Sequence, residues 1–170
     1  MAIALDASTA GSSNDLTQVS TYSHTTGSIV KGVLVVGVHV DNVTDLLTSV
    51  TYNGVAMTRV VAEPSTPTTS VYSYLYLLLD PPSGAHDVVI SISGGANKYI
   101  CSSCASYSGV VQSLTPNASG AKTQAAATSV SLALTTTVDN CWLMGHASRQ
   151  RGCRAVLVGF QQVRTTLRRA

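Results

Sequence analysis

Four cysteines are the side chains best suited to metal or redox chemistry, and two of them form the spacing Cys101-Ser-Ser-Cys104. A structural zinc site would need a second close pair, but eleven residues separate Cys141 from Cys153. If residues 98–108 form a strand, Cys101 and Cys104 point to opposite faces, because side chains alternate along a strand. We therefore expect reduced, partly buried thiols rather than a metal centre. One disulfide, joining Cys101 or Cys104 to Cys141, remains open as an alternative.

Histidines and acids do not form a recognisable catalytic or ligand pattern. The histidines stand singly, without the i, i+2 or i, i+4 spacing of a metal-binding pair; they are His24, His39, His86 and His146. A Ser-His-Asp triad can be drawn in any chain this rich in serine, but the sequence contains no Gly-x-Ser-x-Gly elbow and no glycine-rich phosphate loop. We expect a non-enzymatic protein without cofactor or metal.

Three tyrosines share one face of an expected strand over residues 69–79, namely Tyr72, Tyr74 and Tyr76. Rigid amphipathic rings on a sheet face can stack on sugars, so this row predicts a glycan-binding or partner-binding surface. The alternative is that the row packs beneath a neighbouring strand or against another subunit. The single Trp in the chain favours that alternative, because sugar platforms often use Trp.

Positive charge is concentrated at the C-terminal end. Residues 1–148 hold four cations and all eight acids, a net charge of −4, whereas residues 149–170 hold six arginines and no acid. These arginines are Arg149, Arg151, Arg154, Arg164, Arg168 and Arg169. Clustered arginine can contact nucleic acid, but only Phe160 supplies an aromatic ring among them. We favour a docking arm that pairs with the acidic body of a neighbouring copy or a partner, with a plain solvated terminus as the alternative.

Strand patterns recur along the whole chain. Residues 30–40 (VKGVLVVGVHV) are β-branched and nearly all apolar, which is typical of a central strand buried on both faces. Asn53-Gly54, between strand-like runs at 48–53 and 55–62, predicts a tight hairpin. Further strands are expected over 69–79, 86–93, 98–108, 127–136, 140–147 and 153–160, with a single helical turn at 45–50 and a long polar connection at 110–126.

These patterns predict an all-β fold, an antiparallel, jelly-roll-like β-sandwich of about nine to eleven short strands. At 170 residues the chain fits one domain. We expect residues 1–148 to form the sandwich body, and 149–170 to add the last strand and a docking tail. Charged residues make up 11% of the chain, well below the usual figure of about 25%, so serine and threonine cover the surface instead.

The N-terminal sequence, MAIALDASTAGSSND, lacks both the basic region and the apolar region of a signal peptide. No window has the roughly 18 continuous apolar residues of a membrane span. We therefore expect synthesis in the cytoplasm, with any release occurring by lysis or inside a particle, and no membrane association.

Four runs, read together, resemble a known family. They are 49–60 (SVTYNGVAMTRV), 74–93 (YLYLLLDPPSGAHDVVISIS), 105–116 (ASYSGVVQSLTP) and 138–145 (VDNCWLMG). They resemble small β-sandwich domains found in phage virion genes and in large secreted or surface proteins of bacteria. The resemblance covers about residues 1–146. The chain departs from the pattern of the family after Trp142, as it runs into RQRGCRAVLVGFQQVRTTLRRA. Its motifs are turns and core positions, and it carries no catalytic residue.

The resemblance implies a virion structural protein, expected to be a capsid decoration or cement protein or a related outer fibre or tail component. Such a protein would bind the major capsid protein or another virion protein, and copies of itself as a homo-oligomer. The basic segment, or an N-terminal arm over residues 1–15, would reach the capsid or a neighbour. The alternative function is a carbohydrate-binding module whose tyrosine-lined sheet face holds surface glycans. Nucleic acid is not an expected partner.

Overall fold

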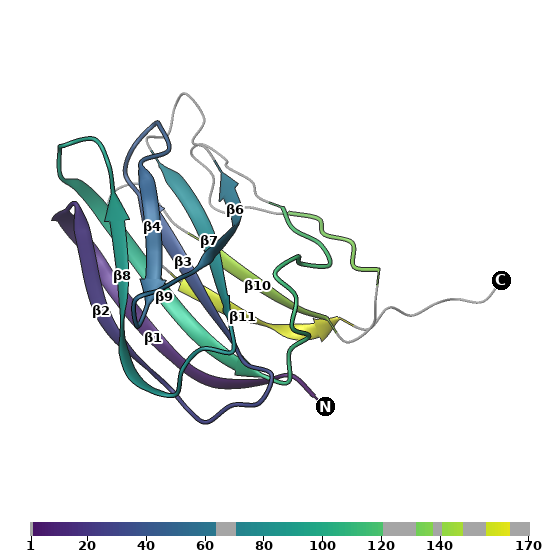
Figure 1. Cartoon of the computed structure of the whole chain (residues 1–170). Coiled ribbons are helices and arrows are strands. Elements are labelled where there is room, and N and C mark those ends of the chain that lie inside the picture. The colour runs from purple at the N-terminus through teal and green to yellow at the C-terminus, as the bar shows by residue number, and fades with distance from the viewer. Residues whose placement is uncertain (1, 64–70, 121–131, 138–140, 148–155, 164–170) are drawn as a thin grey trace.

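Eleven strands make up a computed structural model of the chain (Figure 1), which describes residues 2–63, 71–120, 132–137, 141–147 and 156–163. Nine of these strands form two antiparallel sheets packed face to face, which confirms the predicted β-sandwich. The five-stranded sheet has the order β1 (Ala4–Thr17), β9 (Lys98–Ser108), β3 (Val33–Val40), β7 (Tyr72–Leu79) and β6 (Thr58–Glu63). The four-stranded sheet has the order β2 (Val19–Thr26), β8 (Gly84–Ile92), β4 (Leu47–Tyr52) and β5 (Val55–Ala56).

A separate hairpin, β10 (Cys141–Ala147) with β11 (Val156–Val163), forms a third layer. It contacts strands β3, β7 and β9 of the five-stranded sheet (Figure 1). Sequence reasoning expected strands in both places, but not that they would pair with each other and cover the sandwich from outside. Within the described residues, no helix has the length and apolar character that a membrane span requires.

Strand β3 contributes to two separate hydrophobic cores, because every one of its residues is buried. Leu34, Val36 and Val38 point into the core between the two sheets. Val33 and Val35 point the other way, toward Trp142 of the hairpin. Full burial of such an aliphatic side chain contributes about 1.5–3 kcal/mol each. The prediction that residues 30–40 form a central strand is confirmed.

The turn at Asn53-Gly54 is confirmed. Asn53 has a φ of 50° and Gly54 a φ of 74°, so both central residues adopt the positive values of a type I′ hairpin turn. The single strand expected over 55–62 is wrong, because the chain changes sheets within it. Val55–Ala56 pairs with β4, whereas Thr58–Glu63 pairs with β7. Met57 lies at the crossing, where its side chain is buried and its N–H donates to the carbonyl of Val50 at 2.9 Å.

Two other expectations fail for identifiable reasons. Residues 47–52 are strand β4 rather than part of a helical turn. A register shift between Leu47 and Ser49 lets Leu47 and Val50 both face the core, which imitates the spacing of a helix. Of the strand expected over 127–136, the described part from 132 onward is not a strand. Asn117 instead holds this segment through hydrogen bonds with the backbone N–H and hydroxyl of Thr137, both at 2.8 Å.

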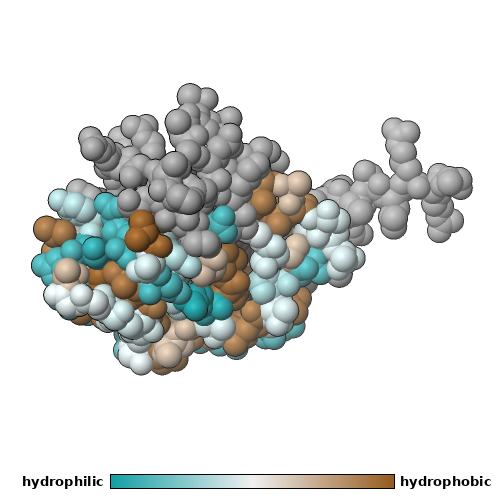
Figure 2. Space-filling view, turned by 90° about the horizontal axis from the view of Figure 1, so that it is seen from above, coloured by the Kyte–Doolittle hydropathy of each residue, from teal (hydrophilic) through white to brown (hydrophobic). Residues whose placement is uncertain are grey.

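The first and last strands of the two packed sheets, β1 and β9, pair at one edge of the five-stranded sheet. Edge strand β1 pairs with β9, so Ala4 lies opposite Ser108 and Thr17 opposite Lys98, with three register shifts along the way. Sequence reasoning expected no strand in residues 4–26, and missed both β1 and β2. Seen from above, hydrophobic and hydrophilic residues are interspersed on the described surface (Figure 2). The proposed division between residues 148 and 149 falls outside the described residues.

We expect Leu34→Ala to lower the free energy of unfolding by about 2–5 kcal/mol, because Leu34 is fully buried between the sheets and a cavity would replace it. Leu5→Ala is the matched control. Leu5 is 54% exposed on the edge strand, so its truncation should cost within about 0.5 kcal/mol. Urea unfolding curves of both variants measure the difference, and equal costs would contradict the assignment of Leu34 to the core.

Candidate functional site

Strand alternation leaves the outer face of the four-stranded sheet open, and we call it the hydroxyl face. On strands β2 and β8 the side chains that alternate with the buried ones point to this side. Thr21 lies beside Val89, which lies beside Thr51, so the three strands present continuous cross-strand rows. The hydroxyl face comprises Val19, Thr21, Ser23, Thr25, Ser49, Thr51, Ala85, Asp87, Val89 and Ser91.

The chemistry of the hydroxyl face is that of an uncharged, hydrogen-bonding surface. Asp87 is its only charged member, and six of the ten residues are Ser or Thr. A hydroxyl both donates and accepts, so it can match either kind of group on a partner. Covering it costs far less than covering a charge. A shallow depression of about 420 Å³ lies over one end of the face and is lined by Thr51, Asn53, Gly54, Ala85, His86, Asp87 and Val89.

The tyrosine row does not lie on a surface. Tyr74 is 1% exposed and Tyr76 is 5% exposed, because this side of β7 faces the core between the sheets. Tyr72 is half-buried and its ring stacks on that of Tyr74, with centroids 5.1 Å apart and planes at 17°. The predicted glycan platform of Tyr72, Tyr74 and Tyr76 is therefore wrong. The alternative, that the row packs beneath other strands, is confirmed.

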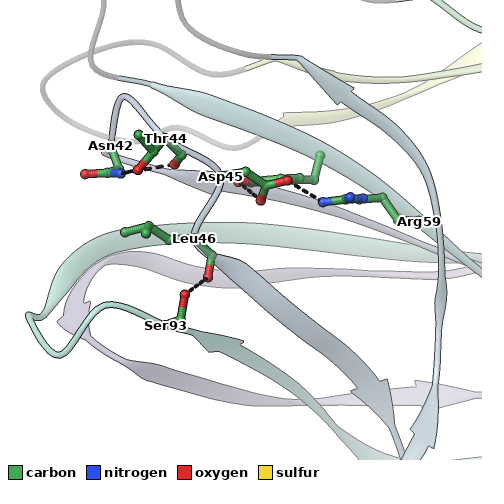
Figure 3. Close-up of polar contacts among 7 residues, drawn as sticks. Asn42, Thr44, Asp45, Leu46, Arg59 and Ser93 are labelled. Carbon is green, nitrogen blue, oxygen red and sulfur yellow. Dashed lines mark hydrogen bonds and ion pairs between the residues drawn. The ribbon is translucent and has the colours of Figure 1, made fainter.

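The hydroxyl of Tyr74 has a positioning role inside the sandwich. It donates to Oδ1 of Asp45 at 2.9 Å. Arg59 donates to Oδ2 of the same carboxylate at 2.6 Å (Figure 3). Burial, reinforced by the bond to Asp45, raises the pKa of Tyr74 far above its ordinary value. The ion pair is partly exposed, so its own contribution is within about 1 kcal/mol. Together these contacts hold the β3–β4 loop against β6 and β7.

A buried chain of hydrogen bonds brings together a serine, a histidine and an aspartate. Ser106 on β9 donates to Oδ2 of Asp6 at 2.6 Å, and Nε2 of His24 lies 3.2 Å from the Ser106 hydroxyl oxygen. Nδ1 of His24 lies 2.8 Å from the hydroxyl of Thr9. Because the Ser106 proton goes to Asp6, Nε2–H of His24 donates to Ser106 and Nδ1 accepts from Thr9.

This order is not that of a hydrolytic triad. In a triad the histidine takes the serine proton and the aspartate holds the histidine, whereas here the aspartate binds the serine and Thr9 holds the histidine. Ser106 is completely buried. Burial lowers the pKa of His24, and Asp6 opposes that shift in part. These hydrogen bonds therefore link strands β1, β2 and β9, and Ser106 is not presented to solvent as a nucleophile.

The cysteines confirm one expectation and correct another. Cys104 lies in the core between the sheets, on the opposite face of β9 from Cys101, as alternation predicts. Burial raises the pKa of Cys104 to about 11, so it stays a neutral thiol at physiological pH. Cys101 is disulfide-bonded, which contradicts the expectation that every thiol is reduced. The pairing with Cys141 is also wrong, because neither Cys104 nor Cys141 forms a disulfide and β10 is not a neighbouring strand of β9.

The structure does not bring the remaining predicted site residues together. His86 meets the edge of the Tyr52 ring, with centroids 5.6 Å apart. His39 and His146 lie on the other side of the molecule, where the hairpin covers β3. In the part of the chain that the structure describes, no three His, Cys, Asp or Glu side chains are placed to hold a metal ion. The docking arginines, which are Arg149, Arg151, Arg154, Arg164, Arg168 and Arg169, lie outside the described residues.

Comparison with known proteins gives no match to any family model, curated protein or solved structure. The relation to phage and bacterial-surface sandwich domains therefore stays a prediction. Sequence reasoning missed the hydroxyl face, although the alternating threonines and serines of VSTYSHTT over 19–26 carried a signal for it. It also missed the Asp6–Ser106–His24 chain, whose members are brought together only by sheet pairing.

Ser106→Ala should lower the free energy of unfolding by about 1–3 kcal/mol, because it leaves Nε2 of buried His24 without an acceptor. Ser23→Ala, on the exposed side of β2, is the control and should change stability by less than about 0.5 kcal/mol. Thermal unfolding at neutral pH measures both. Equal stabilities would show that the hydrogen-bond chain contributes nothing to the fold.

Proposed function

We propose that this chain is a non-enzymatic structural protein of a virion, a capsid decoration or cement protein or a related outer fibre or tail component. In this role it binds the major capsid protein, or another virion protein, and copies of itself. The observation that carries the proposal is the hydroxyl face, which offers ten sheet positions with a single charge. Protein interfaces are depleted of charge at their centres, so this face suits burial against another protein surface.

Two further features support a packing role. The buried side chains of the strands form two hydrophobic cores, one on each face of the five-stranded sheet. The hydroxyl face belongs to neither core and is an open sheet surface. Ser106 and His24 are buried and hydrogen-bonded, and Ser106 donates its proton to Asp6, so these polar groups serve the fold rather than a reaction in solvent. The support for this function is therefore a surface suited to burial against another protein, and not a reactive group.

Charge complementarity supports contact between copies. The body over residues 1–148 carries a net charge of −4, and residues 149–170 carry six arginines and no acid. Opposite charges on two parts of one chain attract neighbouring copies and speed their encounter. In the proposed assembly the basic segment reaches the acidic body of the next copy, while the hydroxyl face covers the capsid.

The test uses capsids assembled in the absence of this protein. The wild-type chain should co-sediment with them, and Thr21→Glu/Thr51→Glu should weaken binding at least about tenfold, because it buries two carboxylates at the centre of the face. Val43→Glu/Val111→Glu adds the same charges at exposed loop positions and should bind like the wild type.

Analytical ultracentrifugation at several concentrations measures self-association in the same samples. A wild-type chain that stays monomeric and does not sediment with capsids would overturn the proposed function. Binding that survives in the Thr21→Glu/Thr51→Glu variant would leave the function standing but remove the hydroxyl face as the site.

A further inference from the structure

Beneath the β10–β11 hairpin, polar atoms are buried without hydrogen-bond partners. They belong to three side chains and are Nδ1 of His39, Oγ of Ser103, and both ring nitrogens of His146. His39 is 3% exposed and Ser103 is 4% exposed. A buried polar group without a partner costs about 1–3 kcal/mol, so this part of the interface opposes the docking of the hairpin.

Strand register explains why these groups meet. Ser103 on β9 lies directly opposite Gly37 on β3, and His39 is two positions further along the same face of β3. The imidazole of His146 lies against Gly37, where a Cβ atom would overlap the ring. Glycine at position 37 therefore makes the gap that admits His146 to the sheet surface.

Apolar contacts supply the attraction that holds the hairpin in place. The ring of Trp142 meets Tyr107 edge-on, with centroids 5.8 Å apart and planes at 72°. Met144 and Trp142 also pack against the cluster of Val33 and Val35. The interface thus combines a hydrophobic contact with imidazole nitrogens that lack hydrogen-bond partners, which are Nδ1 of His39 and both ring nitrogens of His146.

Few titratable side chains of the described residues surround the two imidazoles. On the face of the sheet that the hairpin covers, β9 contributes disulfide-bonded Cys101, Tyr99 and Tyr107. Cys141 of β10 alternates with Trp142, so it lies on the other side of that strand. Two described acids lie near this face. Asp41 is two positions beyond His39 and donates its backbone N–H to the carbonyl of Tyr99 at 3.0 Å, and Glu63 of β6 pairs with Ser73, the neighbour of His39 on β7. Neither Nδ1 of His39 nor the His146 ring is hydrogen-bonded to either carboxylate, so a proton taken up by these nitrogens gains no carboxylate acceptor.

We infer that the β10–β11 hairpin is an acid-releasable cover of the five-stranded sheet, held by apolar contacts at neutral pH and released when His39 and His146 become protonated. Two cations formed side by side in this apolar interface repel each other and lose hydration. Release returns both rings to water, where each charge is solvated. It also exposes the apolar face formed by Val33, Val35, Leu75, Leu77, Leu79 and Tyr107.

The direction of the pH dependence follows from the two rings. Burial lowers the pKa of His39 from 6.5 to about 4, and burial together with the charge of His39 lowers that of His146 to about 4. The released hairpin therefore binds more protons than the docked one between these values. Docking is strongest above pH 6.5 and weakens as the pH falls toward 4, by up to about tenfold per histidine for each pH unit.

Trp142 gives a specific measurement, because it is the only Trp in the chain and it lies in this interface. Its fluorescence is followed during acid titration in the presence of a reducing agent, which removes any restraint from the disulfide at Cys101. Far-ultraviolet circular dichroism of the same samples reports the sheets. We expect the Trp142 emission to shift to longer wavelength between pH 6.5 and 4 and a hydrophobic dye to bind, while the strand signal persists.

Variants separate the two histidines from general acid unfolding. His39→Gln/His146→Gln should lose the Trp142 transition, whereas the control His86→Gln, at the Tyr52 contact, should retain it. Gly37→Ala should expose Trp142 already at neutral pH, because the added methyl group displaces His146. The inference is overturned if the wild-type fluorescence and strand signals change together, or if the Gln double variant keeps the transition at the same pH. Should that double variant not fold, the comparison of the two wild-type signals decides alone.

Discussion

The constraint on which the whole structure depends is the burial of strand β3 on both faces. Its residues, VLVVGVHV, include no charged side chain, and all eight are buried. A strand of this kind needs a cover on each side. The four-stranded sheet covers one face and the β10–β11 hairpin covers the other. The inward position of Tyr74 and Tyr76 follows from the first cover, and the burial of His39 follows from the second.

Much of the fold could be predicted from local pattern, and the failures have local causes. The run over 30–40 identified the central strand, and Asn53-Gly54 identified the hairpin turn. The change of sheet at Met57 could not be seen, because the run VAMTRVVA over 55–62 has no Gly or Pro to mark the crossing. Alternation also shows that Tyr72, Tyr74 and Tyr76 share a face without showing whether that face is inside or outside. Only the packing of the second sheet decides that.

The candidate sites were harder to predict, because their residues are assembled by long-range pairing. Asp6 and Ser106 hydrogen-bond across the β1–β9 ladder, and His24 joins them from the other sheet. No spacing in the sequence connects the three. The hydroxyl face depends on strand β2, whose residues VSTYSHTT contain a single aliphatic side chain and so give a weak strand pattern. The third layer was missed because the pattern of a buried strand such as β3 does not show which element of the chain will cover it.

The pairing of Ala4 with Ser108 has a consequence for how the protein is made. Translation delivers β1 before β9, at about 5–20 residues per second, so β1 waits roughly 5–20 s until its partner has been synthesised. An unpaired strand in a crowded cell invites aggregation with other chains. The composition of β1, ALDASTAGSSNDLT, is small and polar, and its register shifts interrupt a regular ladder. These features make β1 a poor template for foreign strands during the interval in which the nascent chain cannot yet complete its own sheet.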